Sequence, residues 1–378
     1  MNSKIRLGMI GGGKGSLIGI LHRLAAAITE DYELIGGVFN STIQRSIEFT
    51  EELQLDTSRV YENVETMVKR ETALPAEKRI QAVTVATPNF LHYEALTILI
   101  RAGFHIICEK PITITVKEAI EVEKLVRNQG VVFGVAHTYT GYPMVRQMRE
   151  MVEQGRIGKL QKVDAQYYQG WINSFLHNPE NRKEVWRLDP AKSGVSCCMG
   201  DIGVHAFNMI EYVTQHEVER VLADLDTMYE DNPLDVDGTV LIRLQDGTRG
   251  IIRASQIATG EENNMRIALY GDKGALRWEQ ENPNYLEFLQ DGEPARILKP
   301  GNVYSSEFAK SSVKLPAGHP EGIFDAMGNI YKGVALAIRE KKHNKGAYPG
   351  MRDGLRGMKF IETVVSSSKE GNIWKTIN

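Results

Sequence analysis

Two stretches of the sequence contain residue types suited to chemistry, and the first is Cys108-Glu109-Lys110-Pro111. The apolar run at residues 105–108 predicts a short buried strand. Proline fixes φ and has no N–H, so the strand is expected to end here and the backbone to turn. A lysine at the carboxyl end of a parallel strand stands where open α/β sheets bind their ligands. The stretch therefore predicts a ligand-binding turn; the alternative is a solvated lysine on a sharp turn.

The second stretch places a carboxylate and an imidazole four residues apart, at Asp201 and His205. It is expected to open a helix that runs through Tyr212, and positions four apart lie on one helical face. Histidine readily gains or loses a proton near neutral pH, and a carboxylate one turn away can orient the ring and favour its charged form. The pair therefore predicts proton transfer. The alternative is that Asp201 caps the helix and His205 packs in the core.

The elements that position the first stretch alternate between strands and helices. Strands are predicted at residues 5–10, 34–39, 82–86, 105–108 and 131–135, and helices at residues 17–28, 92–102 and 115–127. This alternation predicts a doubly wound parallel sheet in a first domain, residues 1–137. Because right-handed crossovers place the loops after the strands on one rim, several polar side chains are expected there together. They are Asn40, Thr87, Asn89, Lys110 and His137.

The loop after the first predicted strand is rich in glycine, and a helix follows it at once. This order is typical of the front of a dinucleotide-binding βαβ unit, in which glycines let the backbone approach a pyrophosphate and the helix amino terminus favours the anion. Gly11 and Gly13 keep the regular spacing, but Ser16 occupies the third glycine position. Gly19 is the better candidate for the glycine that allows close helix–strand packing, which makes the loop three residues longer than the standard form.

Polar residues near this loop and after the second strand bear on the choice of cofactor. Lys14 and Ser16 either contact phosphate or are solvated loop residues. Folds that prefer NAD usually have a carboxylate after the second strand, whereas this chain has Asn40-Ser41. Asn40 can hydrogen-bond a ribose, and Arg45 is close enough in sequence to meet a 2′-phosphate. Both NAD and NADP therefore remain open.

The second domain, residues 138–378, is expected to contain a mostly antiparallel sheet. After a helix at 142–154, strands are predicted at 162–169, 219–228, 239–244, 250–256, 266–270 and 275–279, with turns at 245–247 and 271–274. One face of such a sheet can pack on helices or on a partner subunit. Because an uncovered apolar face is a liability for a monomer, we expect a homodimer or a homotetramer.

Composition excludes several classes of protein. The chain has 378 residues and a net charge of −3 without a basic run, so nucleic-acid binding is not expected. No stretch approaches the roughly 20 apolar residues that span a bilayer, and the first residues lack a secretory signal. The three cysteines have no metal-like spacing, which predicts reduced thiols and a cytoplasmic location.

The motifs taken together, in their order, resemble the glucose-fructose oxidoreductase / inositol dehydrogenase (Gfo/Idh/MocA) family. The resemblance rests on the glycine-rich loop, Thr87-Pro88-Asn89 with His92, Glu109-Lys110-Pro111, and Gly200-Asp201-Ile202-Gly203-Val204-His205. The extended first loop, residues 137–143, and Trp186-Arg187-Leu188-Asp189-Pro190 are most similar to the levoglucosan-dehydrogenase-like branch. The resemblance implies an NAD(P)-binding Rossmann domain, an α/β domain with an open sheet, and oxidation of a ring hydroxyl of a sugar or anhydrosugar to a ketone.

The resemblance also implies roles for single residues. His205 matches the base that takes the hydroxyl proton, Lys110 would stabilise negative charge on the same oxygen, and Asp201 would orient His205 or bind a neighbouring sugar hydroxyl. No metal is needed, because the lysine supplies the positive charge. The implied cofactor contacts are Gly11, Gly13, Lys14, Ser16, Gly19, Asn40, Ser41, Arg45, Thr87, Pro88, Asn89, His92, Glu109 and Lys110. Candidate substrate contacts, for which packing or surface exposure is the alternative, are His137, Tyr139, Trp171, Trp186, Arg187 and Asp189.

The chain departs from the family pattern at one position implied in substrate binding. Many members of the family have an arginine after the strand that ends near His137, where this chain has Thr138-Tyr139-Thr140. The alternatives to a sugar dehydrogenase are a cyclitol (inositol-type) dehydrogenase, a ketosugar reductase, and a non-enzymatic nucleotide-binding sensor. A sensor requires none of Lys110, Asp201 and His205, so their joint presence favours an enzyme.

Overall fold

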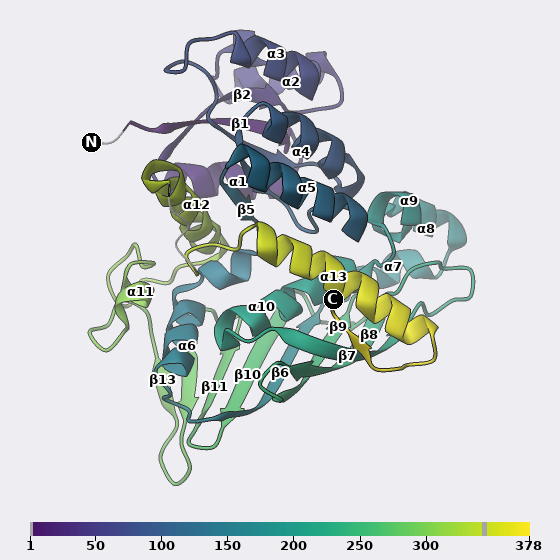
Figure 1. Ribbon diagram of the computed structural model, residues 1–378, viewed down its shortest axis with the longest axis vertical. Coiled ribbons are helices and arrows are strands. Elements are labelled where there is room, and N and C mark those ends of the chain that lie inside the picture. The colour runs from purple at the N-terminus through teal and green to yellow at the C-terminus, as the bar shows by residue number, and fades with distance from the viewer. Residues whose placement is uncertain (1–2, 342–345) are drawn as a thin grey trace. The chain divides into compact units, whose positions relative to one another are not determined.

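The computed structural model describes residues 3–341 and 346–378, which form two compact units (Figure 1). Unit 1 comprises Met1–Thr113, Lys117–Gly141 and Ile323–Leu355; unit 2 comprises Ile114–Val116, Tyr142–Gly322 and Arg356–Asn378. The division at residue 137 that the sequence predicts lies close to Gly141. The segment 323–355, which the sequence division placed in the second domain, is part of unit 1.

Unit 1 contains a five-stranded sheet in the order β2-β1-β3-β4-β5, with all neighbouring strands parallel. Its elements are β1 (Ile5–Gly11), α1 (Leu17–Ile28), β2 (Tyr32–Val38), α2 (Ile43–Glu52), α3 (Val64–Thr72), β3 (Ala82–Ala86), α4 (His92–Arg101), β4 (His105–Cys108), α5 (Val116–Gln129), β5 (Phe133–Val135) and α12 (Ile323–Glu340). The predicted doubly wound parallel sheet is confirmed. Because its strands are parallel, their carboxyl ends lie along one edge of the sheet.

Strands β1, β3, β4 and β5 of this sheet are buried along most of their length, as expected for a parallel sheet covered by helices on its faces. Helix α1 begins after Ser16, whose hydroxyl accepts a hydrogen bond from the Gly19 N–H (3.0 Å). Ser16 is thus an N-cap residue, which satisfies one of the free N–H groups of the first helical turn.

Helix α12 joins unit 1 from a distant part of the chain. Its residues Met327, Tyr331 and Val334 share one buried apolar cluster with Leu21 and Ala25 of α1. Close by in the sequence, Pro349 accepts a hydrogen bond from the Val135 N–H of β5 (2.8 Å). The amino-terminal sheet therefore depends for its core on residues near the other end of the chain.

Unit 2 is built on a nine-stranded sheet in the order β13-β12-β11-β10-β6-β9-β8-β7-β14. Its strands are β6 (Leu160–Tyr168), β7 (Val218–Asp226), β8 (Asp237–Leu244), β9 (Arg249–Ser255), β10 (Asn264–Gly271), β11 (Ala275–Glu279), β12 (Leu286–Leu289), β13 (Arg296–Leu298) and β14 (Lys375–Thr376). All pairs are antiparallel except β6 with β9. The predicted mostly antiparallel sheet is confirmed.

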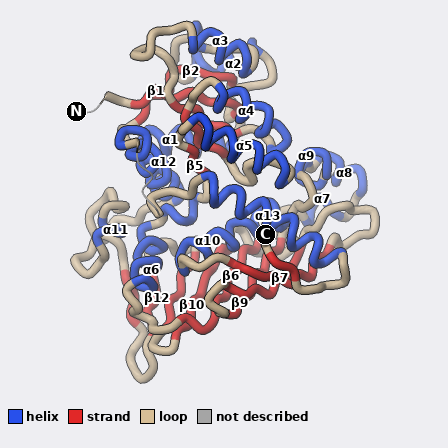
Figure 2. The backbone as a smooth tube through the Cα atoms, in the orientation of Figure 1, coloured by secondary structure: helices blue, strands red, loops and turns tan. Residues whose placement is uncertain are grey.

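Helices of unit 2 lie along one face of this sheet (Figure 2). They include α6 (Pro143–Glu153) and α10 (Val204–Thr214); shorter helices are α7 (Asn173–Leu176), α8 (Pro179–Glu184), α9 (Pro190–Ser193) and α11 (Glu307–Lys310). Helix α13 (Met351–Lys369) begins in unit 1 and continues in unit 2. Burial alternates along β8, which is typical of a sheet with one face packed and one face open.

Two further predictions from the sequence bear on the fold as a whole. All three cysteines are free thiols and buried, as predicted. Within residues 3–341 and 346–378, no helix has both the length and the apolar character needed to cross a membrane.

Candidate functional site

A cavity of about 730 Å³ lies in unit 1 at the carboxyl ends of β1, β2 and β3. The residues that follow these strands line it, together with a segment at 62–65 and part of α4. Of the predicted cofactor residues, those in the lining are Gly11, Ser16, Asn40, Ser41, Thr87 and Pro88. The cavity therefore joins the loops that the sequence singled out for nucleotide binding.

The glycines of the first loop give the backbone of this cavity its shape. Gly11 and Gly12 adopt φ values of 77° and 68°, a region that other residues rarely enter. A Cβ atom at Gly13 would lie 2.6 Å from the carbonyl oxygen of Phe39, and one at Gly19 would overlap the backbone of Gly12. Gly19 therefore allows α1 to approach the loop closely, the role predicted for the third glycine of the fingerprint.

The chemistry of the lining fits a nucleotide. The helix amino terminus at Ser16 faces the loop, so main-chain N–H groups and the helix dipole favour an anion there. The Thr87 hydroxyl is buried in the lining and has no hydrogen-bond partner among the described residues. A bound ribose or phosphate would supply that partner.

The glycine contacts lead to the first testable prediction. Gly13→Val is expected to weaken nucleotide binding by at least about 100-fold, or ~2.7 kcal/mol, because the added side chain must displace Asn40 or the backbone of Phe39. Calorimetry with NAD and with NADP measures the change, and circular dichroism checks the fold. Gly322→Ala is the matched control, because a Cβ atom there meets no atom within 4 Å. An unchanged dissociation constant in Gly13→Val would remove Gly13 from the cofactor site.

The other predicted cofactor residues lie outside the cavity lining among the described residues, and their roles stay predictions. Lys14 is exposed and forms an ion pair with Glu52. Arg45 is also exposed. His92 is fully buried, and its ring nitrogens lie 2.8 Å from the Thr87 carbonyl oxygen and 3.0 Å from that of Pro111. Its ring thus connects the turn after β3 to the turn after β4.

The turn after β4 carries Glu109 and Lys110. The Glu109 N–H donates to the Val85 carbonyl oxygen (3.0 Å), so the parallel ladder continues to Glu109 and stops before Pro111. The Lys110–Pro111 peptide bond is cis. Because β1, β3 and β4 are parallel neighbours, their carboxyl ends lie along one edge of the sheet. Lys110, which comes after β4, therefore lies at the same edge as the loops after β1 and β3. The prediction of a turn at the end of a buried strand is confirmed.

Two predicted substrate contacts follow β5 and are buried. His137 is 2% exposed, and burial, with the positive charge of Lys110, lowers its pKa to about 3, although Glu109 opposes the shift. Its imidazole is therefore neutral at pH 7. Tyr139 is 7% exposed. Neither observation tests a contact with substrate.

The structure corrects the sequence prediction for the start of the helix that carries Asp201 and His205. Residues Met199–Gly203 form a turn of π-helix, and the regular α-helix begins only at Val204. Asp201 therefore lies in the π-helical turn and does not cap the α-helix, whose N-cap is Gly203. π-Helical turns are frequent at functional sites, because they change the direction in which side chains point.

A buried carboxylate holds the residues before this turn. Asp235 accepts hydrogen bonds from the N–H groups of Cys197 (3.1 Å) and Met199 (2.8 Å) and from the Ser196 hydroxyl (3.0 Å). Burial raises the pKa of Asp235, and these bonds oppose the rise. The sequence analysis did not identify Asp235, which stands alone in its stretch without a motif.

The Asp201 carboxylate is fixed by two further residues of unit 2. Its Oδ2 atom accepts a hydrogen bond from Gln256 Nε2 and forms an ion pair with Arg187 Nε, each at 3.0 Å. Gln256 is fully buried, and its own carbonyl group lies 3.2 Å from the Cys197 sulfur. Arg187, predicted as a substrate contact, thus contacts a predicted catalytic residue.

The remaining predicted residues of unit 2 have identifiable partners. His205 is 8% exposed, and its ring centroid lies 6.1 Å from that of Tyr167. The Trp171 indole donates to Gln169 Oε1 (3.1 Å). Asp189 caps α9, and its bond to Lys192, with that to the Ala191 N–H, lowers its pKa.

The cation and the proton-transfer pair belong to different units. Lys110 is part of unit 1, whereas Asp201 and His205 are part of unit 2. Trp186 lies beside Arg187, whose guanidinium carbon is 4.5 Å from the centre of the indole ring. Unit 2 thus contains an imidazole, an anchored carboxylate and aromatic side chains among the predicted site residues.

Two family models match the chain. The model described as an oxidoreductase family with an NAD-binding Rossmann fold matches residues 5–137. The model described as the GFO/IDH/MocA C-terminal domain matches residues 145–277. Both predicted domains are therefore represented, and together the models match well over half of the chain.

Some of the similar proteins match this chain over its full length. The chain is 32% identical over 383 residues to the Bacillus subtilis (strain 168) oxidoreductase YfiI, covering 99% of this chain and 97% of that protein. It is 29% identical over 231 residues to levoglucosan dehydrogenase of Pseudarthrobacter phenanthrenivorans, covering 55% and 57% of the two chains. An inositol dehydrogenase homolog from Azotobacter vinelandii complexed with NAD⁺ has a TM-score of 0.92 at 31% identity and covers 100% of this chain and 98% of that chain. The same homolog complexed with NADH and myo-inositol has a TM-score of 0.90 at 30% identity and covers the same shares.

Proposed function

Because the chain belongs to the GFO/IDH/MocA oxidoreductase family, with an NAD-binding Rossmann domain, we propose that it transfers a hydride between a nicotinamide cofactor and a secondary hydroxyl or ketone of a sugar or anhydrosugar. One observation carries the proposal. Lys110 follows a strand of the same parallel sheet whose neighbouring strand ends form the nucleotide cavity. A fixed positive charge at that edge suits a reaction that develops negative charge on a substrate oxygen.

The proposed roles follow from the chemistry of the reaction. The residues that line the unit 1 cavity would hold the nicotinamide cofactor, which would supply the acceptor for the hydride of the carbinol carbon. His205 accepts the hydroxyl proton as general base, which leaves the oxygen as a ketone oxygen once the hydride has gone. Lys110 hydrogen-bonds this oxygen and stabilises its negative charge on the way. In the reverse direction His205 returns the proton.

Asp201 has the proposed role of a positioning or sugar-binding carboxylate. Gln256 and Arg187 both contact its Oδ2 atom, so the side chain is held before any substrate arrives. An ionised carboxylate also accepts hydrogen bonds from vicinal hydroxyl groups. Together with the aromatic side chains of Trp171 and Trp186, this supports a polyhydroxy substrate rather than an apolar one.

A cyclitol is the second candidate substrate class. The Azotobacter vinelandii homolog, whose structure contains NADH and myo-inositol, matches the whole of this chain at 30% identity. Levoglucosan dehydrogenase matches a little over half of it. The full-length likeness favours testing inositols beside sugars and anhydrosugars.

A substrate screen tests the proposal. Purified protein is incubated with a panel of monosaccharides, anhydrosugars and inositols, each with NAD⁺ and with NADP⁺, and nicotinamide absorbance is recorded. The matching ketones with NADH and NADPH test the reductive direction. We expect turnover with at least one ring alcohol. Nucleotide binding without turnover on any compound would instead favour the nucleotide-binding sensor.

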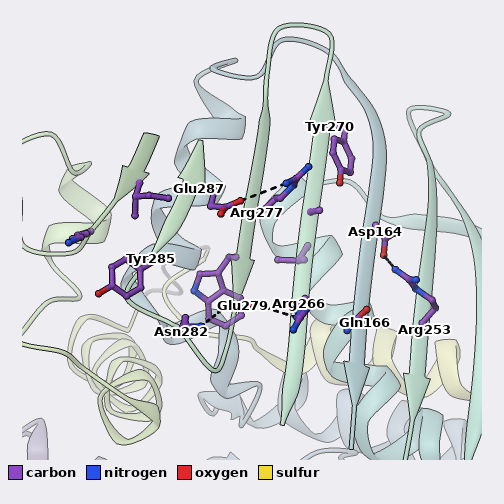
Figure 3. Close-up of a pocket in the computed structure, with 15 residues that line it drawn as sticks. Asp164, Gln166, Arg253, Arg266, Tyr270, Arg277, Glu279, Asn282, Tyr285 and Glu287 are labelled. Carbon is purple, nitrogen blue, oxygen red and sulfur yellow. Dashed lines mark hydrogen bonds and ion pairs between the residues drawn. The ribbon is translucent and has the colours of Figure 1, made fainter. Parts of the chain in front are cut away.

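We also propose that the chain forms a homo-oligomer through the outer face of the unit 2 sheet. This face is hollowed by a cavity of about 660 Å³ and is lined by side chains of neighbouring strands (Figure 3). An apolar face was expected from the sequence; the lining does contain exposed Tyr285 and Ile297, but it also contains three pairs of opposite charges. The pairs are Arg253 with Asp164 (2.6 Å), Arg266 with Glu279 (3.4 Å) and Arg277 with Glu287 (3.8 Å). A two-fold interface joins the same patch of two copies, and a patch with charges of both signs offers opposite charges that can face each other across it.

Light scattering at micromolar concentration tests this assembly. We expect two or four times the 42.4 kDa mass of the chain. Arg266→Glu is expected to lower that mass, because it sets two like charges side by side on the outer face. Lys69→Glu, an exposed charge reversal on α3 in unit 1, is the matched control and should leave the mass unchanged. A monomeric wild type would rule out the assembly.

A further inference from the structure

Four residues from separate elements of unit 1 form a continuous chain of hydrogen bonds that ends at the Glu109 carboxylate. The Thr84 hydroxyl of β3 lies 2.7 Å from the Tyr331 hydroxyl of α12. That hydroxyl lies 2.8 Å from Nδ1 of His22 in α1, and Nε2 of the same ring lies 3.0 Å from Glu109 Oε1. Thr84, Tyr331, His22 and Glu109 are called here the buried hydrogen-bond chain.

The buried hydrogen-bond chain is largely shielded from water, and each of its four side chains has a hydrogen-bond partner. Thr84 and Tyr331 are fully buried, His22 is 1% exposed, and the Glu109 side chain is 13% exposed. With Glu109 as the acceptor, Nε2 of the neutral ring carries the hydrogen, Nδ1 accepts from Tyr331, and Tyr331 accepts from Thr84. A charged ring reverses the last two bonds and leaves the chain intact. Burial raises the pKa of Tyr331 well above its usual value, so its hydroxyl keeps its proton.

The buried hydrogen-bond chain fixes the orientation of the Glu109 carboxylate. One oxygen is taken by His22, and the other accepts the backbone N–H of the next residue, Lys110 (3.2 Å). Burial alone would raise the pKa of Glu109. The hydrogen bond to His22 and the positive charge of Lys110 outweigh it, so the pKa lies below the usual value and the group is an anion at neutral pH.

The helix that carries His22 also contacts the nucleotide loop. The neighbouring residue, Arg23, donates from Nη1 to the Gly12 carbonyl oxygen (2.5 Å). Helix α1 is therefore bonded through consecutive side chains to the loop after β1 and to the turn after β4. Tyr32 strengthens the same region, because its hydroxyl donates to the Tyr331 carbonyl oxygen (2.8 Å) and fixes α12 against β2.

We propose that His22, supported by Tyr331 and Thr84, is a positioning residue for the reaction: it holds the Glu109 carboxylate in place and thereby fixes the backbone and the charged environment of Lys110. The proposal rests on the proposed function insofar as Lys110 acts on the substrate oxygen. It also commits to a consequence that needs no substrate. Displacing the Glu109 carboxylate should change the chemical reactivity of the Lys110 amine, because that carboxylate binds the backbone N–H of Lys110.

A purely structural role for these four residues is the competing explanation. Any buried polar chain stabilises the fold when it is complete, and breaking it costs stability. A structural role predicts a lower melting temperature with an unchanged rate per folded molecule. The positioning role predicts a change in rate that passes through Glu109.

Rate measurements separate the two explanations. His22→Leu is expected to lower kcat by at least about 10-fold, because a misplacement of about 1 Å can cost about 10²-fold. His22→Gln, whose amide can still donate to Glu109, is expected to recover most of the loss. In a Glu109→Gln background His22→Leu should have little further effect, because residues that act through one another are not additive. Thr50→Val, which removes another buried hydrogen bond of unit 1, is the control.

The chemical reactivity of Lys110 gives a readout without turnover. The full chain is treated with an amine-acylating reagent at fixed pH, and modification of Lys110 is followed by peptide mass spectrometry against an exposed lysine, Lys124. His22→Leu is expected to accelerate the modification of Lys110 several-fold, because loss of the His22 bond releases the Glu109 carboxylate and with it the turn that holds the Lys110 amine in place. Tyr331→Phe, which keeps the ring, serves as the second variant if His22→Leu does not fold, and should shift the reactivity in the same direction.

The outcomes distinguish the positioning role of His22 from the proposed role of Lys110 in the reaction. Wild-type kcat and wild-type Lys110 reactivity in folded His22→Leu would overturn the positioning role, even if Lys110→Ala is inactive. A changed Lys110 reactivity in His22→Leu, with normal turnover in Lys110→Ala, would support the positioning chain and remove Lys110 from the proposed reaction. Additive losses of kcat in the double variant would show that His22 does not act through Glu109, which would overturn the positioning role.

Discussion

Replacing His205 by Asn is expected to lower kcat by about 10²–10⁴-fold, the loss typical of a missing general base. Asn keeps a polar side chain of similar size at a position that is 8% exposed, so the packing of α10 should survive. It has no group that takes a proton near neutral pH. The substrate and cofactor identified by the screen are used for the measurement, with nucleotide binding checked by calorimetry.

The pH dependence sharpens the test of His205. In the wild type the rate should fall on the acidic side, because an imidazolium cannot accept a proton. His205→Asn should lose this acidic limb together with most of its turnover, whereas Asp201→Asn should keep the limb with a smaller loss if the carboxylate only orients the ring. His216→Asn is the matched control, a histidine of unit 2 that is 44% exposed and pairs with Asp246. Near-normal turnover in His205→Asn with an unchanged acidic limb would show that another group takes the proton.

Most of unit 1 could be predicted because its signals are local. The strands at residues 82–86 and 105–108 have the predicted bounds, and the first helix was predicted at 17–28, where α1 lies. Each signal is an apolar run of strand length or a helical period, bounded by glycine, proline or a cap. The parallel sheet then follows from the order of the elements.

Helix α12 could not be placed in this way. Its sequence is helical, but its partner is α1, from which it is separated by about 300 residues, and no local pattern names that partner. The same holds for Tyr331, which matters through its contact with His22. His22 did carry a signal, because it interrupts the apolar run of the first predicted helix. A polar residue there has to find a buried partner.

The candidate site in unit 2 shows another limit. Spacing indicated Asp201 and His205 correctly as residues of one helical segment, but the four-residue rule assumes a regular α-helix. The π-helical turn at Met199–Gly203 alters the relation between the two side chains. Tertiary contacts hold this turn: the Asp235 carboxylate accepts from the N–H groups of Cys197 and Met199, and Gln256 donates to Asp201. Neither residue is near the motif in sequence.

The nucleotide loop was predicted more fully than its charged neighbours. The glycines have a backbone reason for their identity, which is readable from their order alone. A charged side chain such as Lys14 has several solvent-exposed arrangements of similar energy, and in this structure it pairs with Glu52. Exposed ion pairs contribute little to stability, so this pairing does not decide whether Lys14 meets a phosphate.

Replacing Lys110 by Ala is expected to lower kcat by about 10²–10³-fold, the cost typical of removing one donor that stabilises a developing oxyanion. The loss should appear in kcat more than in the affinity for NAD(P), because the predicted contacts that line the nucleotide cavity lie in other loops. Lys110→Arg keeps the positive charge, but its planar fork cannot take the place of a compact ammonium, so only part of the rate should return.

Lys124→Ala, an exposed lysine of α5, is the matched control and should retain the wild-type rate. The measurement is kcat, KM and calorimetric nucleotide binding for the wild type and the three lysine variants. A normal kcat in Lys110→Ala would mean that the charge on the substrate oxygen is balanced elsewhere. His137 could not supply it, because burial, the largest cause of its lowered pKa, does not depend on Lys110, and a neutral imidazole carries no positive charge at pH 7. Arg187, a cation among the predicted substrate contacts, is already paired with Asp201, and a double variant Lys110→Ala, Arg187→Ala would test whether it takes over the role.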